Sequence, residues 1–298
     1  MLEPSFLVGQ ALSGLTAAMF LFIVASGLSL VFGVLRVLNF AHGSFYMLGA
    51  YLSWQVTQWI AHWIGPATGS FWLAALGAAA GVALLGGVIE RLLLRHLYGK
   101  EDLYQLLLTY ALVLILGDAA RILWGTQQLA MPRPAGLNGS FEIAGAVVPH
   151  YNFFIIVLGP LLAAGCWLLL SRTGTGRLIR AAAYDREMLA ALGANVGRLY
   201  TLMFMAGAFL AGLGGALVTP VRSIVPGMDV DIIVEAFIVV VIGGLGSFWG
   251  TFLGALIFGQ VLAFGILILP GFSIFAVFAL MALVLIVRPA GLLGRPLS

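Results

Sequence analysis

Long uncharged stretches divide the sequence into apolar segments. Residues 4–35, 37–89, 103–117, 143–171, 199–221 and 236–287 contain no Asp, Glu, Lys or Arg. A helix rises about 1.5 Å per residue and the hydrocarbon layer of a bilayer is about 30 Å thick, so about 20 residues cross it once. The pattern predicts about nine apolar spans, within a range of roughly eight to ten. Their expected positions are 7–30, 43–62, 71–90, 104–124, 151–171, 199–219, 231–244, 250–268 and 272–288. The expected fold is an all-α polytopic membrane protein, with residues 1–298 forming a single transmembrane domain.

Glycine is frequent along these spans, with 39 residues in the chain. No hydrophobic force drives helices together in lipid, so small residues at their contacts allow close backbone packing. We expect such packing at Gly77–Gly81 and at Gly207–Gly215. Glycines also punctuate the segments 33–51 and 239–255, where we expect interrupted helices. These two segments share a short repeat, since Gly-Ser-Phe-Tyr at 43–46 resembles Gly-Ser-Phe-Trp at 246–249.

Composition excludes most soluble classes of protein. Hydrophobic residues make up 62% of the chain and charged residues 8%, whereas soluble domains are about one quarter charged. An ordinary soluble enzyme, a disordered chain and a nucleic-acid-binding domain are therefore excluded. The only lysine, Lys100, is followed by Glu101, so the chain has no GxxxxGK[ST] phosphate-binding loop. The single cysteine, Cys166, lies in an apolar run and is expected to be a buried small residue.

Basic residues orient the chain in a bilayer. With the amino terminus outside, 11 of the 14 basic residues fall on the inner side and 3 on the outer side, namely Arg121, Arg133 and Arg222. This asymmetry follows the positive-inside rule. The predicted topology has the amino terminus outside and the carboxyl terminus inside.

Polar side chains interrupt the apolar runs at two places. Asn39, His42 and Ser44 lie between two apolar runs, and Gly243–Ser247 follows an apolar segment. Polar groups and exposed backbone at membrane depth need protein or water around them. Two interpretations of the first segment stay open: the lining of a substrate path, and a tight loop at the inner surface with Arg36 among the lipid headgroups. No ligand spacing surrounds His42, so a metal site is not expected.

Isolated charges within the spans have two possible roles. Asp118 and Arg121 are three residues apart and are expected to form an ion pair along a helix. Glu235 lies several residues inside an apolar segment, where a carboxylate needs a partner, water or the amine of a substrate. The candidate path residues are Asn39, His42, Gly43, Ser44, Glu235, Gly243, Gly244, Gly246 and Ser247.

One long polar excursion, residues 172–198, lies on the predicted inner side. Gly174 and Gly176 are expected to break the chain, and a short helix is expected to begin at Asp185 and end near Gly193. A helix of this kind either lies on anionic lipid headgroups or docks into a groove on a soluble partner.

Three motifs together resemble the membrane permease subunits of branched-chain amino acid ABC importers, a family that includes urea and amide permeases. The motifs are Asn39-Phe-Ala-His-Gly43 with Met47-Leu-Gly-Ala-Tyr51, then Arg180-Ala-Ala-Ala-Tyr-Asp-Arg-Glu187 with Leu192-Gly193, and last Ala236-Phe-Ile-Val-Val-Val-Ile-Gly-Gly-Leu-Gly-Ser247. The similarity extends along nearly the whole chain. In the second motif Met188-Leu189 stands where the family has two alanines.

The resemblance implies a permease of the bacterial inner membrane that is not itself an enzyme and holds no cofactor, with ATP bound by a partner. The expected partners are a second homologous permease, two ATPase subunits, a periplasmic substrate-binding protein and the lipid bilayer, with no nucleic acid. The loop 172–198 would carry the ATPase-coupling residues Arg177, Arg180, Asp185, Arg186, Glu187, Leu192 and Gly193. The alternative function is an ion-gradient-driven secondary transporter, for which Glu235 and Asp118 are the candidate carboxylates. The sequence leaves open whether the substrate is a branched-chain amino acid, urea, an amide or an organic acid.

Overall fold

The computed structural model describes residues 3–64, 69–268 and 270–294. Helices dominate this part of the chain. They are α1 (Pro4–Leu35), α2 (Ala41–Ile64), α3 (Ser70–Leu92), α4 (Asp102–Trp124), α5 (His150–Arg172), α6 (Gly174–Tyr184), α7 (Arg186–Ala191), α8 (Val196–Val218), α9 (Met228–Gly243), α10 (Phe248–Ile268) and α11 (Ser273–Val287). Two short 3₁₀ helices, η1 (Leu94–Leu97) and η2 (Pro270–Phe272), and two strands, β1 (Ser140–Ile143) and β2 (Ala146–Pro149), complete the described elements.

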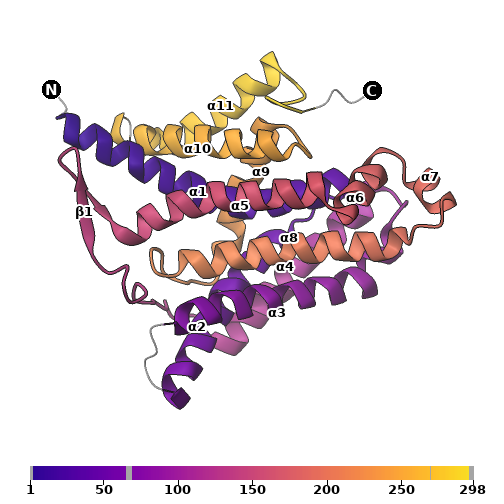
Figure 1. Ribbon diagram of the computed structural model, residues 1–298, viewed down its shortest axis with the longest axis horizontal. Helices are drawn as coiled ribbons and strands as arrows, with labels where there is room; N and C mark the ends of the chain where they lie inside the picture. The colour runs from indigo at the N-terminus through magenta and orange to yellow at the C-terminus, as the bar shows by residue number, and fades with distance from the viewer. Residues whose placement is uncertain (1–2, 65–68, 269, 295–298) are drawn as a thin grey trace.

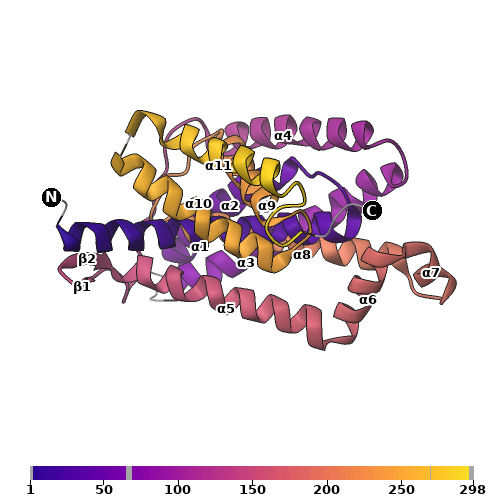
Figure 2. The same ribbon diagram turned by 90° about the horizontal axis from the view of Figure 1, so that it is seen from above.

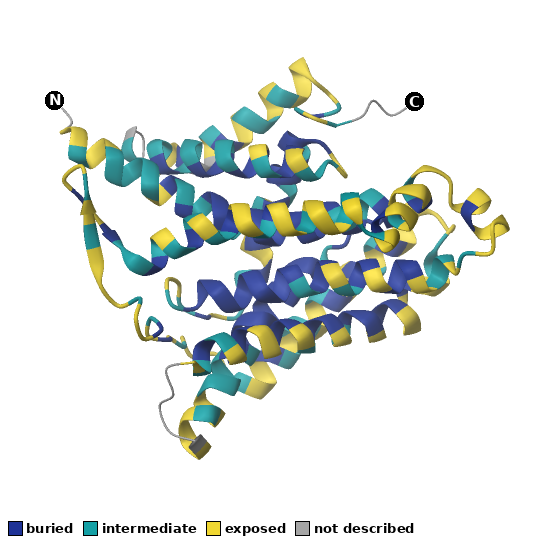
Figure 3. Cartoon of the chain, in the orientation of Figure 1, coloured by how far each residue is buried: buried dark blue, intermediate teal, exposed yellow. Residues whose placement is uncertain are grey.

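Most of the long helices run along one axis of the molecule, with α1 and α8 at the centre (Figure 1). Figure 2 shows α4 and α5 on opposite flanks of this centre. The most apolar stretch of α1 is 72% buried and that of α8 is 78% buried, whereas the value is 17% for both α4 and α5. Figure 3 shows the same contrast between the mainly buried α8 and the exposed face of α5. A helix that is apolar and exposed suits contact with lipid or another apolar surface.

Close helix packing follows the second expected glycine cluster and not the first. A Cβ added at Gly207 would lie 2.9 Å from the Gly27 carbonyl oxygen, and one at Gly212 would lie 2.9 Å from the Val82 Cβ. A Cβ added at Gly77 would meet nothing within 4 Å. The expectation of tight packing at Gly77–Gly81 is therefore wrong for Gly77, because it lies on the exposed face of α3 while the alanines beside it are buried.

Each of the nine predicted spans coincides with one helix, but the number of crossings is not confirmed. Within the described residues, six helices are long and apolar enough to cross a membrane: α1, α3, α4, α5, α8 and α10. Of the other three, α9 has 16 residues and α11 has 15. The third, α2, is long enough, but polar residues such as Gln55 and His62 lower its mean hydropathy.

A small β-hairpin corrects the all-α expectation. Strands β1 and β2 pair antiparallel, with Ile143 opposite Ala146. The two residues between them, Ala144 and Gly145, both have positive φ, at 49° and 83°, as a type I′ turn requires. The hairpin lies beside the start of α1, at the end of the molecule opposite α6 and α7 (Figure 1).

The excursion 172–198 contains two helices, where the sequence predicted one. The expected break lies directly before Gly174, where extended Thr173 separates α5 from α6. The glycines themselves open α6, because the Thr173 hydroxyl accepts a hydrogen bond from the Gly176 amide at 3.0 Å and caps that helix. The predicted short helix is α7, and Asp185 caps it. The prediction was correct for the break and for α7, and it missed α6.

Candidate functional site

The two interrupted segments meet at one place in the fold. The chain leaves α1 through Arg36, which has a φ of 55°, and leaves α9 through Gly244, which has a φ of 105°. A Cβ added at Gly33 would lie 3.2 Å from the Gly246 Cα, so the two breaks pack backbone to backbone. Glycine is required at Gly33 and Gly246 by this close approach.

The chain beyond α11 completes this junction. The Leu292 amide donates to the Ile242 carbonyl at 2.9 Å, and the Leu293 amide donates to the Gly243 carbonyl at 3.0 Å. The last carbonyls of a helix have no partner within the helix. At the end of α9 these carbonyls are satisfied by residues that are about 50 positions later in the sequence.

Polar residues of the first segment are fully buried against neighbouring helices. The His42 Nε2 lies 2.9 Å from the Val24 carbonyl oxygen on α1, to which it donates. The Ser44 hydroxyl donates to Asp229 Oδ2 on α9 at 3.0 Å. Both side chains thus hold α2 against its neighbours.

Two polar groups of this segment have no hydrogen-bond partner among the described residues. They are the side-chain amide of Asn39 and the Nδ1 atom of His42. A buried polar group without a hydrogen-bond partner costs about 1–3 kcal/mol of stability. Such groups are therefore uncommon in native structures. The hydrogen-bonding capacity of these atoms is unused among the described residues.

Sequence reasoning missed Asp229, which is buried at the start of α9. Its carboxylate accepts from Ser44, and its backbone carbonyl lies against Gly43, where a Cβ would be 3.1 Å from the Asp229 carbonyl carbon. The signal in the sequence was the pair Asp229 and Asp231 in the first turn of an apolar helix, where the helix dipole favours acidic groups.

Backbone packing dominates the second segment. Gly243 and Gly244 are buried, Gly246 is exposed and Ser247 is half-buried. The Ser247 hydroxyl accepts from the Gly250 amide at 3.2 Å and so caps the start of α10. The two segments meet through Gly33 and Gly246, but no hydrogen bond between side chains of the first segment and Gly243–Ser247 is found in the described ranges.

Glu235 lies apart from both segments. It is half-buried on α9 and faces a cavity of about 30 Å³ that Tyr46 and Arg222 also line. The other isolated charges behave as expected, since Arg121 Nη1 lies 2.9 Å from Asp118 Oδ1 in an exposed ion pair on α4. Cys166 is only half-buried and free.

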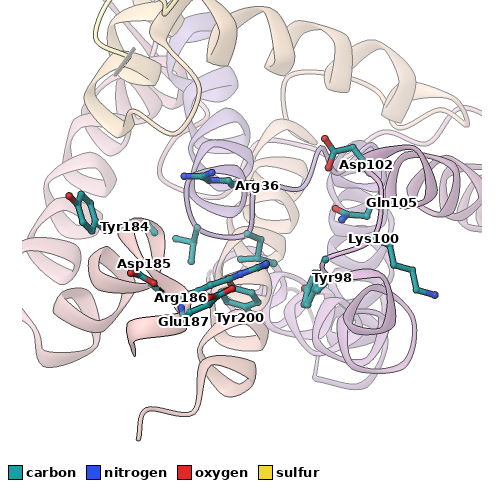
Figure 4. A pocket seen from close by; sticks show the side chains of 15 residues that line it. Arg36, Tyr98, Lys100, Asp102, Gln105, Tyr184, Asp185, Arg186, Glu187 and Tyr200 are labelled. Carbon is teal, nitrogen blue, oxygen red and sulfur yellow. Dashed lines mark hydrogen bonds between the residues drawn. The ribbon is translucent and has the colours of Figure 1, made fainter. Parts of the chain in front are cut away.

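A larger cavity, of about 400 Å³, opens beside the junction of α6 and α7. Figure 4 shows side chains around it from four parts of the chain: the end of α1, the turn from η1 into α4, Tyr184–Glu187, and Tyr200 on α8. Its charged lining residues are Arg36, Lys100, Arg186, Asp102, Asp185 and Glu187. No ion pair joins these six within the described part of the chain, so the cavity offers charges of both signs.

The coupling residues expected from the sequence all lie at the surface of this loop. Arg177, Arg180, Asp185, Arg186, Glu187, Leu192 and Gly193 are exposed. Asp185 Oδ1 accepts from the amides of Glu187 at 3.0 Å and Met188 at 2.9 Å. Leu189 is buried and anchors α7, whereas Tyr184 is 88% exposed and Leu192 is 77% exposed. Exposed apolar side chains on a capped helix form a surface suited to a partner.

A buried carboxylate supports the base of this loop. Glu90, at the end of α3, is fully buried and accepts hydrogen bonds from the Tyr98 hydroxyl at 3.0 Å and the Thr201 hydroxyl at 2.6 Å. Burial, followed by the Glu90 charge, raises the pKa of Tyr98, so its hydroxyl stays protonated and donates. Glu90 carries no distinctive signal in the sequence. An acidic residue next to Arg91 at a helix end is typical of charges at the lipid headgroups.

No group of His, Cys, Asp and Glu side chains that could hold a metal ion is found in residues 3–64, 69–268 and 270–294. The geometry therefore offers buried helix junctions, a small charged cavity and an exposed helical loop.

Comparison with known proteins identifies the family. A family described as "Branched-chain amino acid transport system / permease component" matches residues 10–287. The chain belongs to this family. The resemblance inferred from the three motifs is confirmed, as is the interpretation of the chain as a transport permease with transmembrane helices.

Several curated relatives extend the match over the whole chain. BraD of Pseudomonas aeruginosa, a high-affinity branched-chain amino acid transport permease, is 32% identical over 293 residues, covering 96% of this chain and 95% of that protein. LivH of Escherichia coli K12 is 30% identical over 298 residues, with the same shares covered. A probable branched-chain amino acid permease, LivH of Methanocaldococcus jannaschii, is 27% identical over 246 residues, covering 80% of this chain and 75% of that protein. No solved structure matches the sequence significantly.

Proposed function

We propose that this chain is the translocation subunit of an ATP-driven importer that carries branched-chain amino acids across the bacterial inner membrane. The observation that carries the proposal is the match of residues 10–287 to the permease family, together with relatives of nearly equal length. The chain itself binds no cofactor and hydrolyses no ATP in this proposal. A separate ATPase subunit supplies the energy.

The loop formed by α6 and α7 is the proposed coupling site. Its support is geometric: the loop projects at one end of the molecule (Figure 1), its caps hold α7 in shape, and its apolar side chains are exposed. ATP-driven closure of two ATPase subunits would move this loop and, through α8, the packed helices.

The proposed substrate path follows the two interrupted segments and Glu235. Its support is the set of buried polar atoms on Asn39 and His42 that lack partners, and the backbone contact between Gly33 and Gly246. His42 and Ser44 also hold helices together, so their role would combine packing with lining of the path.

The chain is proposed to work as part of a larger complex. We infer a second homologous permease, two ATPases and a periplasmic binding protein as partners, with the amino terminus periplasmic and the carboxyl terminus cytoplasmic. The exposed apolar flanks on α4 and α5 leave room for lipid and for a second permease.

The test is affinity isolation of the tagged chain from its native membrane in mild detergent, followed by an ATPase assay and identification of partners. We expect an ATPase and a second permease to be recovered, and leucine uptake in the cells to stop on ATP depletion. Replacement of Asp185–Gly193 by a flexible linker should abolish ATPase recovery while the chain still inserts.

A matched pair of point variants sharpens this experiment. Leu192→Ser removes an exposed apolar side chain from the coupling loop, and Val147→Ser removes one, 72% exposed, from the hairpin at the other end. Only Leu192→Ser should weaken ATPase recovery. Isolation of the chain without any ATPase, with uptake that collapses on addition of an uncoupler, would overturn the proposal in favour of an ion-gradient-driven transporter.

A further inference from the structure

A small cavity inside the helix bundle contains one positive and one negative side chain. It lies toward the end of the molecule that carries the hairpin, because Arg222 follows the far end of α8 and Glu235 lies seven residues into α9, about 10 Å from its start. Side chains from α1, α2, α8, α9 and α10 meet there. Apart from the two charges and Tyr46, its lining is apolar and includes Ile232, Phe258 and Leu262.

Arg222 and Glu235 line one cavity but form no salt bridge with each other or with another described residue. In the described ranges neither Arg222 nor Glu235 forms an ion pair or a side-chain hydrogen bond. Arg222 lies at the exposed edge of the cavity, whereas Glu235 is half-buried. Tyr46 is buried and lines the same cavity as the two charges. An acidic group inside an apolar helix is costly unless something compensates it, so Glu235 is poised for a cationic ligand group.

We propose that Arg222, Glu235 and Tyr46 form a binding subsite for the zwitterionic backbone of an α-amino acid. Arg222 would bind the carboxylate, Glu235 the ammonium group, and Ile232, Phe258 and Leu262 would contact an aliphatic side chain. The inference rests on the proposed importer function and adds the residues that would hold the two charged groups of the substrate. Urea and simple amides carry no charge, and organic acids carry no ammonium group, so none of them would use both charges.

The cavity is too small to hold an amino acid in this conformation. A volume of about 30 Å³ holds about one water molecule and not an amino acid. The subsite is therefore closed in this conformation, and the helices around it must separate to admit a ligand. A site that binds well in only one of two conformations is what a transport cycle needs, because a ligand bound equally in both would shift nothing.

The test uses the complete importer in proteoliposomes, with labelled L-leucine as the probe. Glu235→Gln and Arg222→Gln should each lower leucine uptake by about tenfold or more, since loss of one charge-assisted hydrogen bond changes an equilibrium constant by about ten- to a hundredfold. ATPase activity stimulated by the loaded binding protein should stay within about twofold of wild type, because the coupling loop is untouched. Glu142→Gln, on the exposed side of β1, and Arg133→Gln, in the loop before the hairpin, are the matched controls and should leave both activities unchanged.

A double variant separates ligand binding from a structural charge pair. Arg222→Glu combined with Glu235→Arg preserves attraction between the two side chains but reverses the polarity that the ligand meets. Uptake should stay low in this variant, and recovery of uptake would overturn the subsite. If the Gln variants fail to assemble, Glu235→Asp and Arg222→Lys displace the charges without removing them, and normal uptake in these assembled complexes would overturn it equally.

Failure of the subsite and failure of the importer are distinguishable. If Glu235→Gln and Arg222→Gln take up leucine at the wild-type rate, the subsite is contradicted and the importer function is unaffected. If the wild-type complex hydrolyses ATP but transports no amino acid, both the proposed substrate class and the subsite are contradicted.

Discussion

Glu90 connects three separate parts of the chain through one carboxylate. It accepts from Tyr98, which follows η1, and from Thr201 on α8. Because α8 follows α7 after a short turn, this cluster fixes the base of the coupling loop against α3. Fully buried carboxylates persist where hydrogen bonds satisfy them, and here two hydroxyl groups do so.

Removal of the Thr201 hydroxyl tests this cluster. Thr201→Val keeps the shape of the side chain but leaves Oε2 of the buried Glu90 without its short hydrogen bond, which should cost about 1.5–3 kcal/mol. The measurement is thermal unfolding of the detergent-solubilised complex. Thr57→Val is the control, because that hydroxyl bonds only to the Ser53 carbonyl of its own helix. Equal shifts for the two variants would contradict the assigned role of Glu90.

Two glycines that look alike in sequence differ in their surroundings. A Cβ at Gly215 would fall on the Tyr46 carbonyl oxygen and lie 3.0 Å from the Ala50 amide, while one at Gly77 would enter open space. Gly215→Ala should therefore destabilise the protein by about 1–3 kcal/mol through overpacking. Gly77→Ala should be neutral or stabilising by up to about 1 kcal/mol, since alanine is the better helix former.

Measurement of both glycine variants by the same thermal unfolding assay checks this difference. A loss of stability at Gly77 as large as that at Gly215 would show that the contact surfaces are assigned wrongly. The sequence predicted that glycines would mark helix contacts, but it could not predict which face of a helix meets a neighbour. That choice depends on the arrangement of helices in space, which local composition does not encode.

At the scale of single elements, the loop of α6 and α7 shows what capping signals can and cannot predict. The acidic opening at Asp185 and the closing Gly193 predicted α7, and the structure has α7 at Arg186–Ala191. The glycines at 174 and 176 predicted a break, which lies between α5 and α6, but they did not predict that α6 begins there. Gly176 is buried against the end of α5, where a Cβ would lie 2.6 Å from the Leu170 carbonyl carbon, so its glycine serves a tertiary contact that sequence alone does not reveal.

The cap of α7 gives a prediction at this scale. Asp185→Ala removes the acceptor for the amides of Glu187 and Met188, which should cost about 1 kcal/mol and fray a helix of only six residues. We expect a lower ATPase rate stimulated by the binding protein in the reconstituted complex, with normal insertion of the chain. Asp185→Asn keeps an acceptor oxygen and should retain most of that rate. If the Asn variant were as impaired as the Ala variant, the charge of Asp185 and not its capping would be the important property.

At the scale of the whole molecule, the order of apolar segments was predictable and their arrangement was not. Uncharged stretches placed nine helices to within a few residues, because burial in lipid demands long apolar runs. Contacts such as Gly33 with Gly246, or Leu292 with Ile242, join residues far apart in sequence and carry no local signal. The hairpin was missed because two four-residue strands leave only a weak pattern among helices.

We predict that the end of the molecule with the coupling loop faces the cytoplasm and that the hairpin faces the periplasm. The hairpin and the coupling loop lie at opposite ends (Figure 1), and the excess of basic residues at the coupling end should keep that end inside. In a Cys166→Ala background, a membrane-impermeant maleimide should label Val147→Cys in cells whose outer membrane is permeabilised, and should label Tyr184→Cys only after the inner membrane is lysed. Both introduced positions are well exposed, at 72% and 88%, so a difference in labelling would report sidedness and not burial. The reverse order of labelling would place the coupling loop outside, where no ATP is available to drive it.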